Sequence, residues 1–180
     1  MGNSLMERCV GVMISPKKTF LNAAENHNER HVIFLSLLFG FLFAHQIIRS
    51  ENRDLFFYFT TALSSGIGFV YFSGFFLSWL IKITGPIVDP GKMRMVLAYA
   101  LTPYILALSL LLLSKGTPIP MGTTVSFFLT VFSWGLAVLG VKTVAQIKWV
   151  QSLFVIILPV AALLLVISIL FKLAWMTSGV

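Results

Sequence analysis

Residues 55–81 read LFFYFTTALSSGIGFVYFSGFFLSWLI and contain no charged side chain. An α-helix rises about 1.5 Å per residue, so about 20 apolar residues cross the hydrocarbon core of a bilayer, which is about 30 Å thick. At 27 residues this stretch is long enough to span a membrane as one helix. It predicts an integral membrane protein.

Similar stretches of low charge lie on both sides of this one. The predicted membrane spans are residues 32–48, 56–81, 95–114, 122–141 and 150–171. The expected fold class is therefore an all-α integral membrane protein, a bundle of five transmembrane helices preceded by short interfacial amphipathic helices. Residues 1–31 form the expected cytoplasmic or interfacial segment, and residues 32–180 form the expected membrane domain.

The composition supports a chain whose solvent is largely lipid. Of the 180 residues, 58% are hydrophobic and 11% are charged, whereas a soluble domain has about 25% charged residues. The formal net charge of +7 comes from basic residues that are scattered between the apolar stretches. Because they do not form one basic stripe, we expect no nucleic-acid partner.

The distribution of basic residues predicts the orientation. Lys and Arg in short loops are retained in the cytoplasm. Nine of the 13 basic residues flank the ends of the spans that lie on the side of the N-terminus, and four flank the opposite ends. We therefore expect a multi-pass protein with a cytoplasmic N-terminus and an external C-terminus, in the plasma (inner) membrane if the protein is prokaryotic.

Two short amphipathic helices are expected before the first span. In the first, apolar residues recur on one helical face and Ser4, Glu7, Arg8 and Gly11 lie mostly on the other. The apolar face comprises Leu5, Met6, Cys9, Val10 and Met13. We expect this helix to lie on the membrane surface. Cys9 is interpreted as a small apolar residue, with palmitoylation as the alternative.

The second short helix is expected to begin at Ser15-Pro16 and to continue toward Ala24 and Glu25. Serine is a favoured N-cap, and proline is favoured at the first helical position. Lys17 and Lys18 then lie in the first turn, where the helix dipole disfavours cations. Anionic lipid headgroups are the expected partners of these two lysines.

No pattern in the chain indicates a catalytic, cofactor-binding or metal-binding site. His27 and His31 have the i, i+4 spacing of a metalloprotease helix, but Glu29 does not directly follow the first histidine as that motif requires. His45 near the external end of the first span is interpreted as an interfacial histidine, with a proton relay as the alternative. Pro103 and Pro159 are expected to kink the third and fifth spans.

Two short motifs resemble the Yip domain family. They are Ser-Pro-Lys-Lys-Thr-Phe at residues 15–20 and Ala-Tyr-Ala-Leu-Thr-Pro-Tyr at residues 98–104. Looser similarity covers residues 85–94 and 134–146. The family-type residues are Ser15, Pro16, Phe20, Tyr99 and Pro103.

The resemblance implies five spanning helices, a cytosolic N-terminus and an external or lumenal C-terminus. Eukaryotic members interact with prenylated Rab-type GTPases and act in early secretory membrane traffic. This chain lacks their long, acidic N-terminal region and is similar to the compact prokaryotic members. A small GTPase is therefore implied as a partner only for a eukaryote-like form.

Two functional hypotheses follow. The first is a non-enzymatic scaffold or adaptor that binds a protein partner or anionic lipid headgroups through a basic cytoplasmic face, with homo-oligomerisation left open. The expected face comprises Arg8, Lys17, Lys18, Lys92, Arg94, Lys142 and Lys148. The alternative is a small permease or lipid-handling protein that opens a path at its proline kinks.

Overall fold

The computed structural model describes residues 4–48, 55–114, 121–159 and 161, and all regular structure in this part of the chain is helical. The helices are α1 (Leu5–Ile14), α2 (Pro16–Glu25), α3 (Glu29–Ile47), α4 (Leu55–Leu63), α5 (Phe69–Thr84), α6 (Pro90–Ala100), α7 (Thr102–Leu113) and α8 (Met121–Ala145), with the π-helix η1 (Ser64–Gly68) joining α4 to α5. A further helix spans Trp149–Pro159. The all-α fold class is confirmed.

Four helical segments in the described part of the chain are long and apolar enough to cross a membrane. They are Glu29–Ile47, Leu55–Ile83, Pro90–Leu113 and Thr123–Ala145. They overlap the first four predicted spans, and the first and the third begin earlier than expected. Of the predicted fifth span, 150–171, the structure describes the helix Trp149–Pro159. The rest of that span lies outside the described residues.

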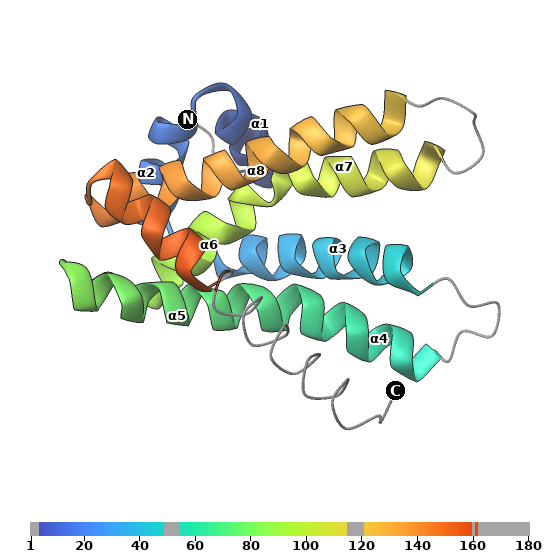
Figure 1. Ribbon diagram of the computed structural model, residues 1–180, viewed down its shortest axis with the longest axis horizontal. Coiled ribbons are helices and arrows are strands. Elements are labelled where there is room, and N and C mark those ends of the chain that lie inside the picture. Colours follow the sequence, from blue (N-terminus) through green and yellow to red (C-terminus); the bar gives the residue numbers. More distant parts are fainter. Residues whose placement is uncertain (1–3, 49–54, 115–120, 160, 162–180) are drawn as a thin grey trace, which may run out of the picture.

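The spans form two antiparallel pairs with α6 between them (Figure 1). The segment α4–η1–α5 runs back along α3, and α8 runs back along α7. Residues 95–100 of α6 are all buried, and Tyr99 is 0% exposed. Helix α6 is therefore the centre of the core.

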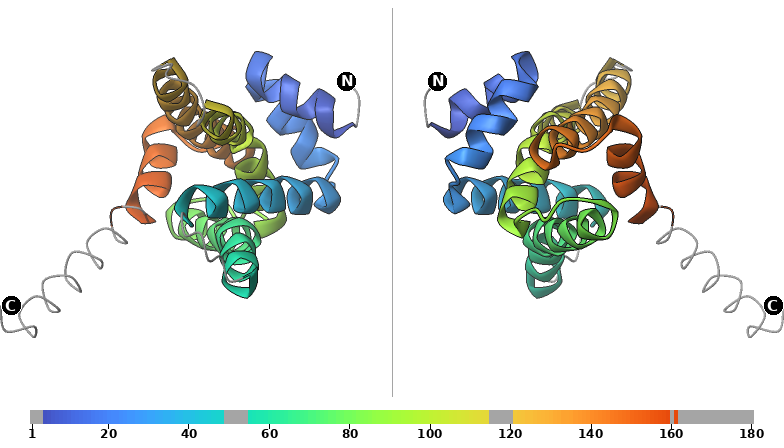
Figure 2. Two further views of the ribbon diagram at one scale, coloured as in Figure 1. Left: turned by 90° about the vertical axis from the view of Figure 1, so that its right-hand side faces the viewer. Right: turned by 90° about the vertical axis from the view of Figure 1, so that its left-hand side faces the viewer.

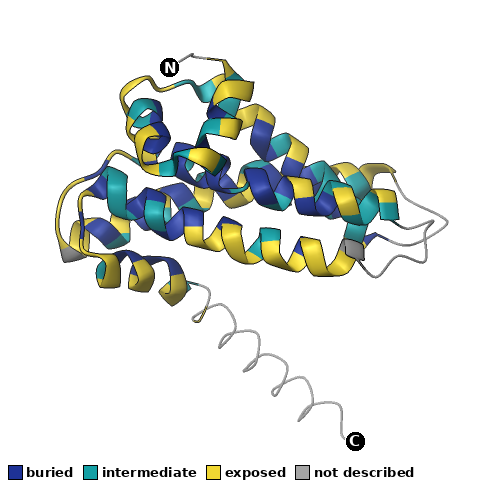
Figure 3. Cartoon of the chain, turned by 90° about the horizontal axis from the view of Figure 1, so that it is seen from above, coloured by how far each residue is buried: buried dark blue, intermediate teal, exposed yellow. Residues whose placement is uncertain are grey.

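The outer surfaces of the spans are rich in apolar side chains. Figure 3 shows exposed residues along the outside of the helices and buried residues between them. Phe72 and Phe75 of α5 are 70% and 63% exposed, and Phe128 of α8 is 65% exposed. Such a surface is stable against lipid tails, which supports the membrane assignment.

Small residues bring α3 and η1 into backbone contact, as they commonly do between transmembrane helices. A Cβ atom at Gly66 would lie 2.2 Å from the carbonyl oxygen of Ser36, and one at Gly40 would lie 2.0 Å from the carbonyl oxygen of Ala62. Gly68, two residues after Gly66, is exposed and does not share this contact.

The third span breaks at Pro103, as expected. Proline has no N–H to give to the carbonyl four residues earlier, so α6 ends at Ala100 and α7 begins at Thr102. The Ser133 hydroxyl of α8 donates a hydrogen bond of 2.6 Å to the Ala100 carbonyl beside the break. A neighbouring helix thus donates a hydrogen bond to the backbone next to the kink.

Helices α1 and α2 pack against the bundle, on the side opposite to the Trp149–Pro159 helix (Figure 2). Helix α1 begins with a capping box, in which the Ser4 hydroxyl accepts from the Glu7 N–H and the Glu7 carboxylate accepts from the Ser4 N–H. Helix α2 begins as predicted, with Ser15 as N-cap and Pro16 as its first residue. Phe20 of α2 is 1% exposed and lies against Gly140 of α8.

Candidate functional site

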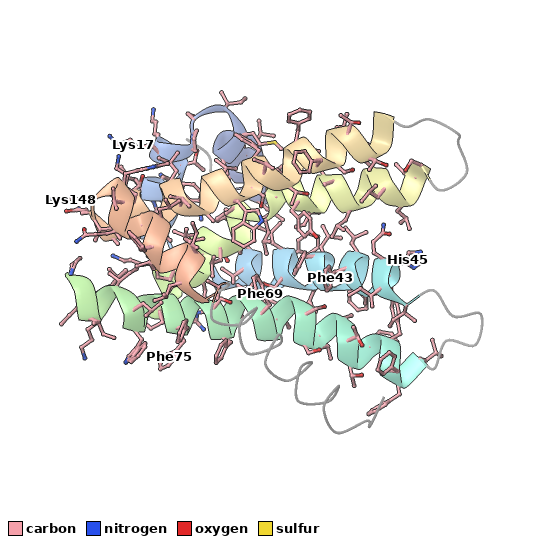
Figure 4. The ribbon with its side chains drawn as sticks, viewed as in Figure 1. Lys17, Phe43, His45, Phe69, Phe75 and Lys148 are labelled. Atoms are coloured by element: carbon pink, nitrogen blue, oxygen red, sulfur yellow. The ribbon has the colours of Figure 1, made fainter. Side chains whose placement is uncertain are left out.

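Most of the basic residues of the predicted functional face lie at one end of the bundle. We call this end the N-face and define it by α2, by the connecting residues 26–28, 85–89 and 146–148, and by the adjoining first turns of α3 and α6 and last turn of α8. An even number of membrane crossings separates these connections, so they meet on the same side. Figure 4 shows Lys17 and Lys148 at this end and His45 at the opposite end.

The seven predicted basic residues differ in their exposure. Lys17, Lys18, Lys92 and Lys148 are exposed, and none of them forms an ion pair with another described residue. Lys142 is half-buried, with its ammonium group 5.4 Å from the centre of the Trp149 ring. Arg94 is also half-buried, whereas Arg8 is 3% exposed.

Arg8 lies inside the protein, which differs from the exposed position that sequence analysis expects. Helix α1 turns Arg8 and Val12 inward, and its exposed residues include Met6 and Ile14, each 78% exposed. The Arg8 side chain interacts with the hydroxyl of Tyr99. A buried cation is stable only next to polar groups of the protein, and the Tyr99 hydroxyl is such a group for Arg8.

The Tyr99 hydroxyl also binds His31. His31 Nδ1 lies 2.7 Å from the Tyr99 oxygen, and His31 Nε2 lies 3.2 Å from Nδ2 of Asn28. Asn28 is the N-cap of α3, since its side-chain oxygen accepts from the Arg30 N–H. Helices α1, α3 and α6 are therefore joined through one buried phenol.

Arg94 belongs to a second polar cluster, formed with His27, Glu29 and Tyr71. The Glu29 carboxylate lies 3.5 Å from Arg94 Nη1 and 2.6 Å from His27 Nε2, and it accepts a hydrogen bond from the Tyr71 hydroxyl. The Arg94 guanidinium lies 4.6 Å from the centre of the Tyr71 ring. Arg94 therefore has partners within the protein, and it links α6 to α3 and α5.

A glycine on α5 makes room for this arginine. A Cβ atom at Gly74 would lie 2.4 Å from Cγ of Arg94. The pairing of Arg94 with Glu29 is not among the predictions from the sequence. Opposite charges near the N-face ends of two predicted spans are the signal that could have indicated this pair.

His27 and His31 are partners in the polar clusters described above. Within the described residues no three His, Cys, Asp or Glu side chains are grouped so that they could hold a metal ion. His27 contacts Glu29, and His31 contacts Tyr99.

A pocket with a volume of about 440 Å³ opens at the N-face. It lies between the connection that precedes α6 and the end of α8. Its lining residues are Pro86, Ile87, Val88, Asp89, Lys92, Val144, Ala145 and Gln146. Gln146 has a φ of 55°, which turns the chain sharply after α8.

This pocket was not predicted from the sequence, although Lys92 belongs to the predicted basic face. The residues that line it belong to the two looser regions of family similarity, 85–94 and 134–146. Their arrangement depends on how the end of α8 meets the start of α6, which the sequence pattern does not specify.

The family-type residues are structural. Ser15 and Pro16 begin α2, Phe20 fills the space beside Gly140, Tyr99 joins three helices, and the buried Pro103 ends α6. These positions explain the pattern through packing, and none of the five residues lines the pocket.

The comparison with protein families agrees with these observations. A family model described as the Yip1 domain matches residues 10–170 of the chain. The comparisons with curated proteins and with solved structures each found no match.

Proposed function

Since this chain belongs to the Yip1 domain family and is a multi-pass integral membrane protein, we propose that it is a non-enzymatic membrane adaptor. In this proposal the N-face lies in the cytoplasm and binds an acidic surface of a protein partner. The bundle holds the binding surface at the membrane and has no catalytic role.

The charge distribution supports the cytoplasmic orientation. The nine basic residues on the N-terminal side of the spans are Arg8, Lys17, Lys18, Arg30, Lys82, Lys92, Arg94, Lys142 and Lys148. A K/R excess on one side of the spans favours the cytoplasm for that side.

The observation that carries the proposal is the gathering of four exposed lysines at the N-face. Lys17 and Lys18 are on α2, Lys92 is in the first turn of α6, and Lys148 follows α8. They form no ion pair with other described residues, whereas Arg94 has Glu29. Lysines without ion-pair partners form a positive surface that steers and orients an acidic protein surface.

The alternative hypothesis, a permease with a path at the proline kink, receives less support. Pro103 is fully buried, and the Ser133 hydroxyl binds the carbonyl beside it. The pocket described above lies at the N-face instead.

Crosslinking in cells through photoreactive leucine, followed by capture of the tagged full-length protein and mass spectrometry, tests the adaptor function. This chemistry does not consume lysines, so charge variants can be compared directly. We expect a cytoplasmic protein to be enriched by the wild type and lost in the variant Lys17→Glu, Lys18→Glu.

The variant Lys17→Arg, Lys18→Arg keeps the charge and is the matched control, which should retain the partner. Recovery of the same proteins with all three forms would exclude these lysines from partner binding. Enrichment of a partner on the external side of the membrane would contradict the orientation.

A further inference from the structure

The pocket at the N-face has one acidic and one basic residue in its lining. Asp89 and Lys92 both line it and are exposed. Their spacing of three residues would allow a salt bridge, but neither takes part in an ion pair within the residues that the structure describes. Two opposite charges therefore face one cavity without neutralising each other.

Asp89 also makes no helix cap, although it is the N-cap residue of α6. Aspartate at this position normally accepts a hydrogen bond from a backbone N–H of the first turn. The Asp89 side chain makes no such bond, and its Oδ2 atom lies 2.8 Å from the place that a Cβ of Gly91 would occupy. Glycine at 91 thus leaves space for the carboxylate, which remains able to bind a cation.

The walls of the pocket are fixed by the bundle. Val88 is 8% exposed, and its carbonyl accepts a hydrogen bond from the Ser78 hydroxyl of α5. Ala145 is 2% exposed at the end of α8. One wall is thus fixed to α5 through Ser78, and the other wall belongs to α8. Because both walls are fixed, the pocket is formed before a ligand binds.

The surroundings of the pocket place it at the level of lipid headgroups. Ile87 in its lining is 83% exposed, and Ile83 and Trp79 at the end of α5 are 64% and 50% exposed. Tryptophan is enriched at the boundary between hydrocarbon and water. A charged pocket beside exposed apolar residues matches a molecule with a charged head and apolar tails.

We propose that this pocket binds the headgroup of a zwitterionic phospholipid of the phosphoethanolamine type, with its ammonium against Asp89 and its phosphate against Lys92. Both contacts are charge-assisted hydrogen bonds, which are stronger than neutral ones. An anionic phospholipid without an ammonium would leave Asp89 without a cation and close to a phosphate. The volume of about 440 Å³ lies in the usual range for small-molecule sites.

Native mass spectrometry of the full-length protein in detergent tests the proposal. The probes are dimyristoyl phosphatidylethanolamine and dimyristoyl phosphatidylglycerol, which have the same acyl chains. We expect the wild type to prefer the ethanolamine lipid by about tenfold, as expected for one charge-assisted hydrogen bond. Asp89→Asn should abolish this preference, and Lys92→Gln should weaken binding of both lipids.

Lys148→Gln removes an N-face charge outside the pocket and is the control, which should keep the preference. Equal binding of the two lipids by the wild type, or an unchanged preference in Asp89→Asn, would overturn the proposal. Melting temperatures of all variants in the same detergent show whether they remain folded.

Soluble phosphoethanolamine distinguishes a lipid ligand from the free zwitterion. We expect it to displace the bound lipid only at a concentration far above that of the lipid, since it lacks acyl chains. Displacement at equal concentration would contradict the assignment to lipid. Lipid binding in the pocket goes beyond the adaptor function. Lys17 and Lys18 do not line the pocket, so their variants test partner binding without changing the lipid site. Either proposal can therefore fail while the other holds.

Discussion

The hydroxyl of Tyr99 lies 2.7 Å from Nδ1 of His31, and this contact fastens the first turns of α3 to the buried centre of α6. The same hydroxyl interacts with the side chain of Arg8 of α1. A single phenol on α6 therefore holds an N-terminal helix and a membrane span in place. The contact explains why a tyrosine occupies a position that is 0% exposed.

Replacing Tyr99 by phenylalanine should destabilise the protein. The change removes one oxygen atom and leaves the buried Arg8 and the half-buried His31 without this partner, which costs about 1–3 kcal/mol. Thermal unfolding in detergent, followed by circular dichroism, should show a clearly lower melting temperature. Tyr104→Phe is the control, because the structure shows no hydrogen bond for the Tyr104 hydroxyl among the described residues. Equal melting temperatures for the two variants would contradict the role of Tyr99.

Replacing Gly66 by alanine should separate α3 from η1. The new Cβ would lie 2.2 Å from the Ser36 carbonyl oxygen, and backbone atoms cannot move aside as a flexible side chain can. Overpacking of this kind costs about 1–3 kcal/mol. Gly135→Ala on α8 is the control, since a Cβ there meets no atom within 4 Å. If Gly66→Ala is as stable as Gly135→Ala toward SDS-induced unfolding, the close approach does not exist in the membrane protein.

Much of the fold could be predicted from the sequence, because charge is costly in hydrocarbon. The charge-free residues 55–81 predict the span that the structure shows as Leu55–Ile83. The π-helix within it could not be predicted, since it depends on how Gly66 meets α3. The start of α3 at Glu29 was also missed, because Tyr71 and Arg94 of other helices satisfy that charge.

The candidate site was predicted less completely than the fold. Lys17, Lys18, Lys92 and Lys148 are exposed at one face, as the charge pattern indicates. Arg8 was placed on the wrong side of α1, because an amphipathic pattern gives two faces without showing which one meets the protein. The pocket beside Asp89 is formed by contacts between segments that are far apart in the sequence, and such contacts produce no periodic pattern of apolar residues.

Cys9 should react slowly with maleimides. Burial raises the pKa of its thiol, and its sulfur lies 3.8 Å from the Thr102 hydroxyl oxygen. Less thiolate is then present at a given pH, and thiolate is the reactive form. We expect Cys9 at pH 8 to react about tenfold more slowly than the exposed thiol of a Cys9→Ala, Lys18→Cys variant. Similar rates would show that α1 does not cover this thiol.

A cysteine at position 104 should resist water-soluble reagents. Tyr104 follows the buried Pro103 and is half-buried in the core. In a Cys9→Ala, Tyr104→Cys variant reconstituted in liposomes, we expect no labelling by a charged methanethiosulfonate, whereas the Lys18→Cys variant should be labelled. Fast labelling at 104 would demonstrate an aqueous path at the kink and favour the permease hypothesis.

The adaptor function is tested most directly by placing a photoreactive phenylalanine analogue at single positions in living cells. Leu21 lies one turn after Lys17 on α2 and is 38% exposed, whereas Phe128 on the outer surface of α8 is 65% exposed. We predict that irradiation links position 21 to a defined protein partner and position 128 to lipid. The same adducts at both positions, or no protein adduct at position 21, would contradict the account of the N-face as a docking surface for a protein.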